Sequence, residues 1–306
     1  MKVITSGSAY LDIDAWACCI AYAELLNLQG IPARAVSSAK PNASVSKTVL
    51  GWGAVLEDYR PTSSDEFVLV DVSDYHHFDP MVALDRVVEV IDHHPGFENH
   101  WAQTLGSAAD IRPIGAAATQ VFQRWKAAGL LPRISEQSAA LLATAILDNT
   151  LNFTGQMTTA ADIEAYAELA PHGKLTADWP EQYFLECQAT IESDMSAALA
   201  ADLKRMKPES RLPEVFAQMT VWDADALIEK YRNEICRWMG GQGDDWLLNV
   251  ISISQRKSCL LAEPVVSQQK LSRLLPMEWQ AGLAVLKPSI LRKELLKLGL
   301  SVNPDG

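Results

Sequence analysis

The chain has little positive charge. Its 306 residues include 26 Lys and Arg against 38 Asp and Glu, which gives a formal net charge of −12 at pH 7. Because proteins bind phosphate backbones through clustered positive charge, this balance argues against long nucleic acid as a partner. A small phosphate substrate is compatible with it, because a metal ion and a few local cations can attract such a molecule to an acidic protein.

The chain also lacks cysteines at metal-binding spacing and long apolar runs. The five cysteines, at positions 18, 19, 187, 236 and 259, are odd in number and show no metal-type spacing, which indicates a reducing compartment rather than a disulfide framework or a structural zinc site. No apolar stretch reaches about 18 residues without a charge, so we expect no membrane span. Residue 1 runs directly into a predicted strand with no signal peptide, and we therefore expect a cytoplasmic protein.

The length and pattern of the chain predict two domains. A chain of 306 residues with 48% hydrophobic content exceeds what one compact core usually holds. A segment with Pro and Gly, residues 171–190, is the expected transition, so we predict domains 1–190 and 191–306. The predicted fold class is α/β, with a parallel-sheet N-terminal domain that carries helices on both faces and a smaller mixed α/β C-terminal domain.

The triplet Asp92-His93-His94 directly follows the apolar run 87–91. Such a run is typical of a parallel strand buried on both faces, and open α/β sheets bind ligands outside the carboxyl ends of these strands. Adjacent histidines after a strand are more often plain loop residues. A functional interpretation therefore depends on partners at the ends of other buried elements.

Two carboxylates, Asp12 and Asp14, lie between the predicted strand 2–6 and a strongly helical segment, 15–26. Helix capping is the alternative interpretation of this pair, because Asp near a helix start accepts hydrogen bonds from free backbone N–H groups.

Two further carboxylates end buried segments. Asp71 closes the apolar strand 67–70, and Asp148 ends the apolar helical run 139–147. A carboxylate in such a place needs a compensating charge, and a metal cluster is the common explanation for all these positions. Mixed carboxylate and imidazole ligands suit Mn²⁺, Mg²⁺, Co²⁺ or Zn²⁺ in a catalytic site. Two such ions about 3.5–4 Å apart can bridge a water and lower its pKa for attack on phosphorus.

The order Asp-x-Asp, strand-end Asp, Asp-His-His and a later Asp resembles the DHH phosphoesterase superfamily, in the branch of family II (manganese-dependent) inorganic pyrophosphatases and prune-like exopolyphosphatases. Segments 115–119 and 147–162 resemble the small-residue helix start and the fourth-Asp segment of these proteins. The resemblance implies Mn²⁺ as cofactor, with Mg²⁺ or Co²⁺ as alternatives, and two ions per site. The implied metal ligands are Asp14, Asp71, His93 and Asp148 for one ion, and Asp12 with the bridging Asp71 for the other.

The same resemblance implies roles for the rest of the triplet. Asp92 would orient ligating imidazoles, and His94 would face the phosphate and the leaving group. The chain departs from the family II pyrophosphatases at Ser8, where they carry a His four residues before the first motif Asp. Exopolyphosphatases and prune-like proteins carry Asn there, so loss of this His does not by itself imply loss of hydrolysis. It does make a dedicated pyrophosphatase a less favoured interpretation.

The C-terminal half carries weaker signals. Segments 202–204 and 289–295 resemble the Asp-x-Lys and Arg-Lys motifs of this branch, so Lys204, Arg292 and Lys293 would clamp phosphate oxygens. The alternatives are a solvated helix face or a rival basic pair at 256–257. Residues 240–243 form the one glycine cluster, and we interpret it as a helix-ending loop rather than the phosphate-binding stretch of the oligoribonuclease-like branch.

These observations predict a divalent-metal-dependent hydrolase of phosphoanhydride bonds in pyrophosphate or short polyphosphate. One alternative is a phosphodiesterase acting on short oligonucleotides or cyclic dinucleotides. Another is a degenerate member that binds metal or nucleotide without catalysis. A homodimer remains one option for the assembly.

Overall fold

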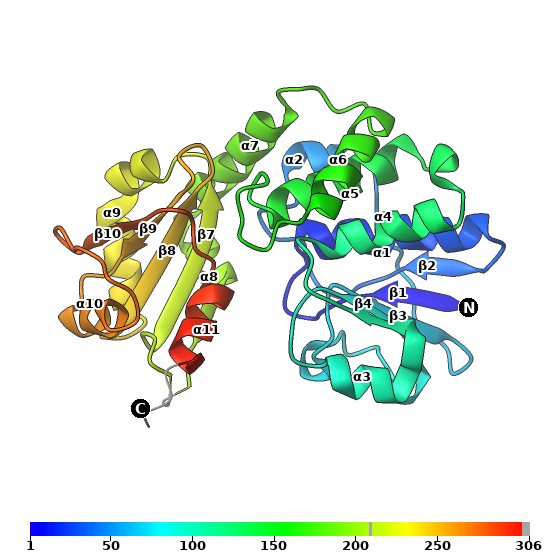
Figure 1. Cartoon of the computed structure of the whole chain (residues 1–306), viewed down its shortest axis with the longest axis horizontal. Helices are drawn as coiled ribbons and strands as arrows, with labels where there is room; N and C mark the ends of the chain where they lie inside the picture. The colour runs from blue at the N-terminus through cyan, green and yellow to red at the C-terminus, as the bar shows by residue number, and fades with distance from the viewer. Residues whose placement is uncertain (208–209, 302–306) are drawn as a thin grey trace. The chain divides into compact units, whose positions relative to one another are not determined.

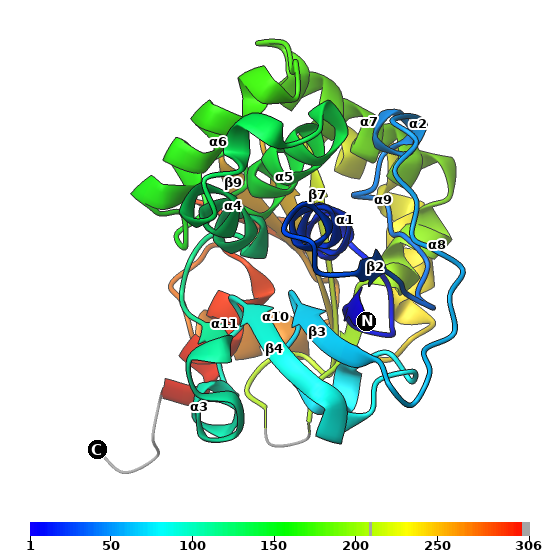
Figure 2. The same cartoon turned by 90° about the vertical axis from the view of Figure 1, so that its right-hand side faces the viewer.

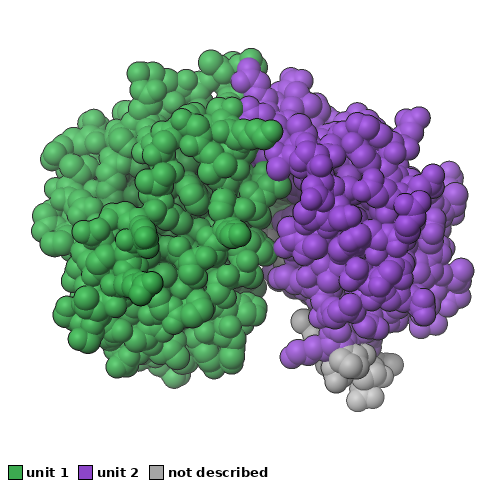
Figure 3. Space-filling view, turned by 180° about the vertical axis from the view of Figure 1, so that it is seen from behind, with its two compact units in different colours: residues 1–180 green, residues 181–306 purple. Residues whose placement is uncertain are grey.

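The computed structural model describes residues 1–207 and 210–301, apart from the side chains of residues 293 and 299–301. The chain forms two compact units, Met1–Pro180 and Glu181–Gly306 (Figures 1 and 3). The boundary expected at residue 190 falls inside helix α7, Trp179–Ser193. No described helix combines the length and the apolar character that crossing a membrane requires.

The first unit is built on a five-stranded sheet in the order β2-β1-β3-β4-β5, in which every pair of neighbours is parallel. Its strands are β1 (Lys2–Thr5), β2 (Ala33–Ala35), β3 (Glu66–Val70), β4 (Val87–Asp92) and β5 (Ala109–Ile111). Because all five run the same way, their carboxyl ends share one edge. The strands predicted from apolar runs at 2–6, 67–70 and 87–91 are confirmed as β1, β3 and β4.

Helices cover both faces of this sheet, as predicted: α1, α4, α5 and α6 lie on one side and α3 on the other (Figures 1 and 2). The helices are α1 (Ile13–Leu28), α2 (Lys47–Gly51), α3 (Glu98–Leu105), α4 (Ala117–Ala127), α5 (Glu136–Asn149) and α6 (Ala160–His172). Short 3₁₀ turns lie at Tyr75–His77, Leu84–Arg86, Gly106–Ala108 and Leu131–Arg133. Helix α1 is apolar around most of its circumference and is buried accordingly, with Cys18 and Cys19 fully inside.

The second unit has a mixed five-stranded sheet in the order β10-β9-β8-β7-β6, in which β7 and β8 are parallel and the other pairs antiparallel. Its strands are β6 (Leu203–Arg205), β7 (Val215–Val221), β8 (Trp246–Ser252), β9 (Lys257–Leu261) and β10 (Leu283–Leu286). Its remaining helices are α8 (Met195–Ala201), α9 (Ala224–Gly240), α10 (Val265–Ser272) and α11 (Arg292–Ser301).

The core of the second unit joins the sheet to its last two helices. Phe216, Leu247 and Leu260 from three neighbouring strands pack with Leu271 of α10 and Leu295 of α11. The predicted helix-ending role of the glycine cluster is confirmed, because α9 ends at its first glycine and the second is the C-cap residue. The predicted fold class, a parallel-sheet α/β unit followed by a mixed α/β unit, is thus confirmed.

Candidate metal centre

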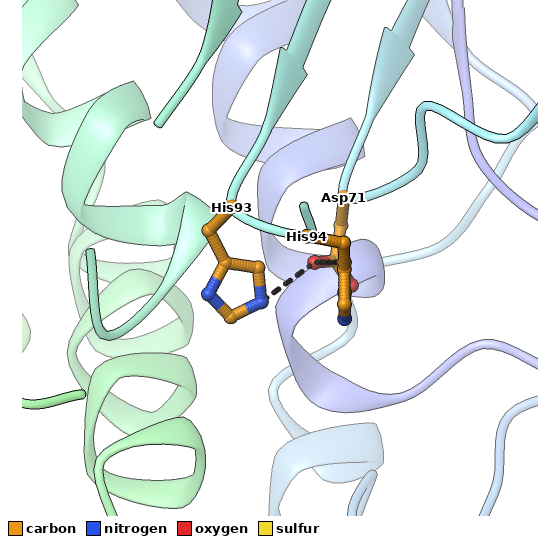
Figure 4. A group of neighbouring side chains, drawn as sticks. All are labelled: Asp71, His93 and His94. Carbon is orange, nitrogen blue, oxygen red and sulfur yellow. Dashed lines mark ion pairs between the residues drawn. The ribbon is translucent and has the colours of Figure 1, made fainter. Parts of the chain in front are cut away.

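Two adjacent strands bring three predicted site residues together at the carboxyl edge of the first sheet. Asp71 follows β3, and His93 and His94 follow β4 (Figure 4). One ligand atom from each of the three lies within 4.8 Å of the others. This carboxylate and imidazole donor set suits a divalent cation of the Mn²⁺, Co²⁺ or Zn²⁺ type.

The ring of His93 is held with one nitrogen aimed at carboxylates. Its Nδ1 lies 3.0 Å from the carbonyl oxygen of Ile114 and donates a hydrogen bond, since a carbonyl can only accept. In the neutral imidazole Nε2 then presents a lone pair, and it lies 3.4 Å from Asp71 Oδ1 and 4.0 Å from Asp14 Oδ2. This nitrogen has no hydrogen-bond partner among the described residues. Acceptor atoms that converge on one buried point fit a bound cation.

Asp14 is fully buried at the start of another helix. Its two carboxylate oxygens accept hydrogen bonds from the backbone N–H groups of Ala117 and Ala118, each at 2.8 Å. Burial raises the pKa of Asp14 well above its ordinary value, and the negative charge of Asp71 raises it further. A divalent cation beside these carboxylates would oppose both effects and favour the ionised forms.

Asp92 orients the second histidine of the triplet rather than the ring of His93. Its Oδ1 accepts from the backbone N–H groups of His93 and His94, at 2.8 and 3.2 Å, and from His94 Nδ1 at 2.8 Å. Burial alone would raise the pKa of Asp92, but the hydrogen bond and charge of His94 outweigh it and hold the pKa below its ordinary value. The His94 side chain is 50% exposed, which leaves its outer nitrogen accessible.

The backbone at Asp71 is strained. Its φ is 57°, in the left-handed region that non-glycine residues seldom adopt and that Asp and Asn tolerate best. The Asp71 N–H donates to the Ile91 carbonyl at 2.8 Å, which ties the turn to β4. Such strain is found preferentially at functional sites, where the surrounding structure enforces it.

The other predicted N-terminal positions lie outside the group of three. Asp12 is the N-cap of α1 and accepts a hydrogen bond from the Ala15 N–H at 3.0 Å. It therefore caps the helix, which was the alternative interpretation to metal binding. Asp148 lies in the last turn of α5 and is half-buried. The Ser8 hydroxyl donates to the His77 carbonyl at 3.3 Å. Metal ligation by Asp12, Asp14 and Asp148, like that by Asp71 and His93, stays a prediction.

The basic residues predicted for the second unit are partly engaged elsewhere. Arg292 is buried, its Nη1 donates to the Asp202 carbonyl at 2.7 Å, and its Nη2 forms an ion pair with the Asp202 carboxylate. Burial and the charge of Arg292 lower the pKa of Lys204. The side chain of Lys293 lies outside the described part of the chain. The rival Lys257 binds both carboxylate oxygens of Asp225, at 2.7 and 2.6 Å.

One buried carboxylate near the site received no role in the sequence prediction. Asp162, at the start of α6, accepts from the backbone N–H of Gly115 at 3.0 Å. The capping box that it forms with Thr159 was the available signal, since Thr and Asp three residues apart mark a helix start. Nothing local in the sequence indicates its contact with Gly115.

A parallel sheet with Asp and Asp-His-His side chains at neighbouring strand ends defines the class of DHH-type α/β domains. Known proteins agree with this class, although no family model matches the chain. The chain is 25% identical over 299 residues to a probable manganese-dependent inorganic pyrophosphatase of Bacillus licheniformis, covering 96% of each protein. It is 30% identical over 204 residues to a probable manganese-dependent inorganic pyrophosphatase of Deinococcus radiodurans, covering 64% of this chain and 60% of the other.

Solved structures share the fold. A candidate family II inorganic pyrophosphatase of Methanococcus jannaschii superposes with a TM-score of 0.72 at 16% identity, covering 98% of this chain and 100% of the other. An exopolyphosphatase-related protein from Bacteroides fragilis gives a TM-score of 0.53 at 15% identity, covering 97% and 89%. These structures share the fold, and the sequence relatives relate the chain to the DHH phosphoesterase superfamily.

Proposed function

We propose that this protein is a divalent-metal-dependent hydrolase of phosphoanhydride bonds, acting on pyrophosphate or short polyphosphate. The observation that carries this proposal is the convergence of His93 Nε2 and Asp71 Oδ1, 3.4 Å apart, on a buried point at the carboxyl edge of a parallel sheet. Relatives named as manganese-dependent inorganic pyrophosphatases support Mn²⁺ as the metal and a small phosphate as the substrate.

Each residue of the centre has a distinct part in this proposal. Asp14, Asp71, His93 and Asp148 would hold one ion, and Asp12 with the shared Asp71 would hold the other. When bound, a divalent ion lowers the pKa of a coordinated water and neutralises charge on phosphoryl oxygens. His94, with Nδ1 fixed by Asp92, turns its exposed nitrogen to the phosphate and can exchange a proton with the leaving group.

We assign the metal chemistry to residues 1–190 and the phosphate contacts to residues 191–306. In the second part, Lys204, Arg292 and Lys293 are the proposed phosphate ligands. Arg292 already pairs with Asp202, so it would fix the local backbone as much as it would contact the substrate. Its positive charge also lowers the pKa of Lys204.

The experiment is phosphate release by the purified full chain from pyrophosphate and from tripolyphosphate, with Mn²⁺ or Mg²⁺. Asp71→Asn tests the proposal without disturbing the backbone, because Asn tolerates positive φ. Asp74→Asn is the matched control, because Asp74 is a nearby carboxylate that binds only the exposed His76 in the described structure.

Release that disappears in Asp71→Asn and persists in Asp74→Asn supports the proposal, and the faster substrate shows the preferred chain length. Equal release by wild type and Asp71→Asn would trace the activity to a contaminant and overturn it. A protein that binds Mn²⁺ but releases no phosphate from either substrate would be a phosphodiesterase or a binding protein instead.

A further inference from the structure

Asp162 is a fully buried carboxylate with more hydrogen bonds than helix capping requires. Its Oδ2 accepts from the N–H and the hydroxyl of Thr159, both at 2.7 Å, which completes the capping box of α6. The same oxygen accepts from the Gly115 N–H at 3.0 Å, and Oδ1 accepts from the Thr119 hydroxyl at 2.6 Å. The last two partners are 47 and 43 residues away in sequence, so capping does not account for them.

The contact with Gly115 leads directly to the metal centre. The peptide group that joins Ile114 to Gly115 donates its N–H to Asp162 and accepts, at the Ile114 carbonyl, from His93 Nδ1 at 3.0 Å. A carboxylate, one peptide group and the imidazole therefore form a continuous hydrogen-bonded chain. Hydrogen bonds in such a chain polarise and strengthen one another in a buried environment.

The packing around Gly115 leaves no room for a side chain. A Cβ atom at Gly115 would lie 2.6 Å from Asp162 Oδ2 and 2.7 Å from Thr150 Cγ2, so the position requires glycine for space rather than for backbone conformation. Two residues further along, the same segment donates the Ala117 N–H to Asp14 at 2.8 Å. The segment 114–118 thus binds both His93 and Asp14. Asp162 fixes this segment through its hydrogen bond from the Gly115 N–H.

We propose that Asp162 is a positioning residue of the metal centre. Through the peptide between Ile114 and Gly115 it keeps the proton of His93 on Nδ1 and the lone pair of Nε2 directed at Asp71. The nitrogen that would ligate a metal is set by the hydrogen bond of the other nitrogen, and such outer partners strengthen metal binding. This inference deepens the proposed function and rests on it for the identity of the bound ion.

Three variants of the full chain test the proposal. Asp162→Ala removes the whole network. Asp162→Asn keeps its shape, because an amide oxygen can replace Oδ2 and the amide nitrogen can donate to the Thr119 hydroxyl, but it removes the charge. Thr159→Ala is the matched control, because it weakens the same helix start and leaves the bond from Gly115 to Asp162 in place.

Two readouts need no catalysis. Long-range ¹H–¹⁵N NMR of the metal-free protein reports which nitrogen of His93 carries the proton, and a titration followed by electron paramagnetic resonance gives the affinity for Mn²⁺. For Asp162→Ala we expect a mixture of the two His93 tautomers and an affinity for Mn²⁺ about tenfold lower. This is the small end of the losses seen when a residue that supports a metal ligand is removed. We expect a smaller loss for Asp162→Asn and no change in either readout for Thr159→Ala.

A folded Asp162→Ala protein with the wild-type tautomer and affinity would overturn the proposal. If that variant does not fold, the same result for Asp162→Asn, with no change in either readout, would overturn it. A wild-type protein that takes up no divalent ion would refute the proposed function, while the tautomer measurement would still decide whether Asp162 positions His93.

Discussion

His93 Nε2 and Asp71 Oδ1 face each other at 3.4 Å in a buried place, although both are acceptors when the imidazole is neutral and the carboxylate is ionised. The hydrogen bond from His93 Nδ1 to the Ile114 carbonyl fixes the ring in this orientation. A cation between the two atoms converts an unfavourable contact into two favourable ones. The proposed ligands are therefore already arranged in the metal-free protein, which would lower the cost of binding a metal.

Asp71→Gly should remove metal stabilisation without weakening the metal-free protein. Glycine adopts the φ of 57° without strain, and loss of the carboxylate relieves the charge repulsion on Asp14. Free Mn²⁺ at about 100 times its Kd should raise the unfolding free energy of the wild type by about 2.7 kcal/mol and that of the variant not at all. Thermal unfolding with Mn²⁺ and with a chelator measures both. Asp74→Asn should respond as the wild type does, and a Mn²⁺ response in Asp71→Gly would contradict the assignment.

The two histidines should separate metal binding from proton transfer. His94→Ala should lower the rate of phosphate release about a hundredfold or more and leave Mn²⁺ affinity nearly unchanged, because its ring is half exposed and anchored by Asp92. His93→Ala should lose Mn²⁺ affinity itself. A Mn²⁺ titration and a phosphate-release assay on each variant check the pair. Weakened Mn²⁺ binding in His94→Ala would make His94 a ligand, as its place in the group of three allows.

The sequence predicts the strand ends of this site because they are local features. An apolar run followed by Asp or by Asp-His-His marks where a buried strand stops, and the shared direction of parallel strands then brings Asp71 and His93 to one edge. Which atoms meet depends on contacts between distant segments. That Asp92 binds the ring of His94, and that the Ile114 carbonyl binds the ring of His93, could not be read from spacing.

The second unit shows the same limit. The end of helix α9 at its glycines follows from local pattern. The burial of Arg292 against Asp202 does not, because arginine in a predicted helix is usually solvated and its ion pair spans 90 residues of sequence. Long-range pairing of charges carries no periodic signal that a single sequence displays.

Asp65→Asn should destabilise the protein in a pH-dependent way. Asp65 Oδ2 accepts hydrogen bonds from the Tyr59 hydroxyl and from the Thr62 N–H, both at 2.6 Å, just before β3 begins. These bonds hold the pKa of Asp65 below its ordinary value of 3.8. The folded state then binds fewer protons than the unfolded state, so this contribution is present above the unfolded pKa and is lost as pH falls through the folded pKa.

Urea unfolding at a series of pH values, with chelator present, measures this effect. The wild type should exceed Asp65→Asn in unfolding free energy by about 1 kcal/mol or more at pH 7, and the difference should shrink below about pH 4. Asp58→Asn, at an exposed aspartate of the same loop region, should change stability little at any pH. A difference between wild type and Asp65→Asn that stays constant with pH would show that the charge of Asp65 contributes nothing.

Lys204 and Arg292 should differ in how their loss affects the protein. Lys204→Gln should raise KM for pyrophosphate with an unchanged unfolding temperature. Arg292→Gln should lower the unfolding free energy by about 2 kcal/mol, less than for a fully buried pair because the Asp202 side chain keeps 27% exposure. Asp202→Asn should reproduce much of that stability loss, since it leaves the buried guanidinium without its carboxylate. Arg292→Gln with wild-type stability and a raised KM would instead make Arg292 a direct phosphate ligand whose pairing with Asp202 gives way when substrate binds.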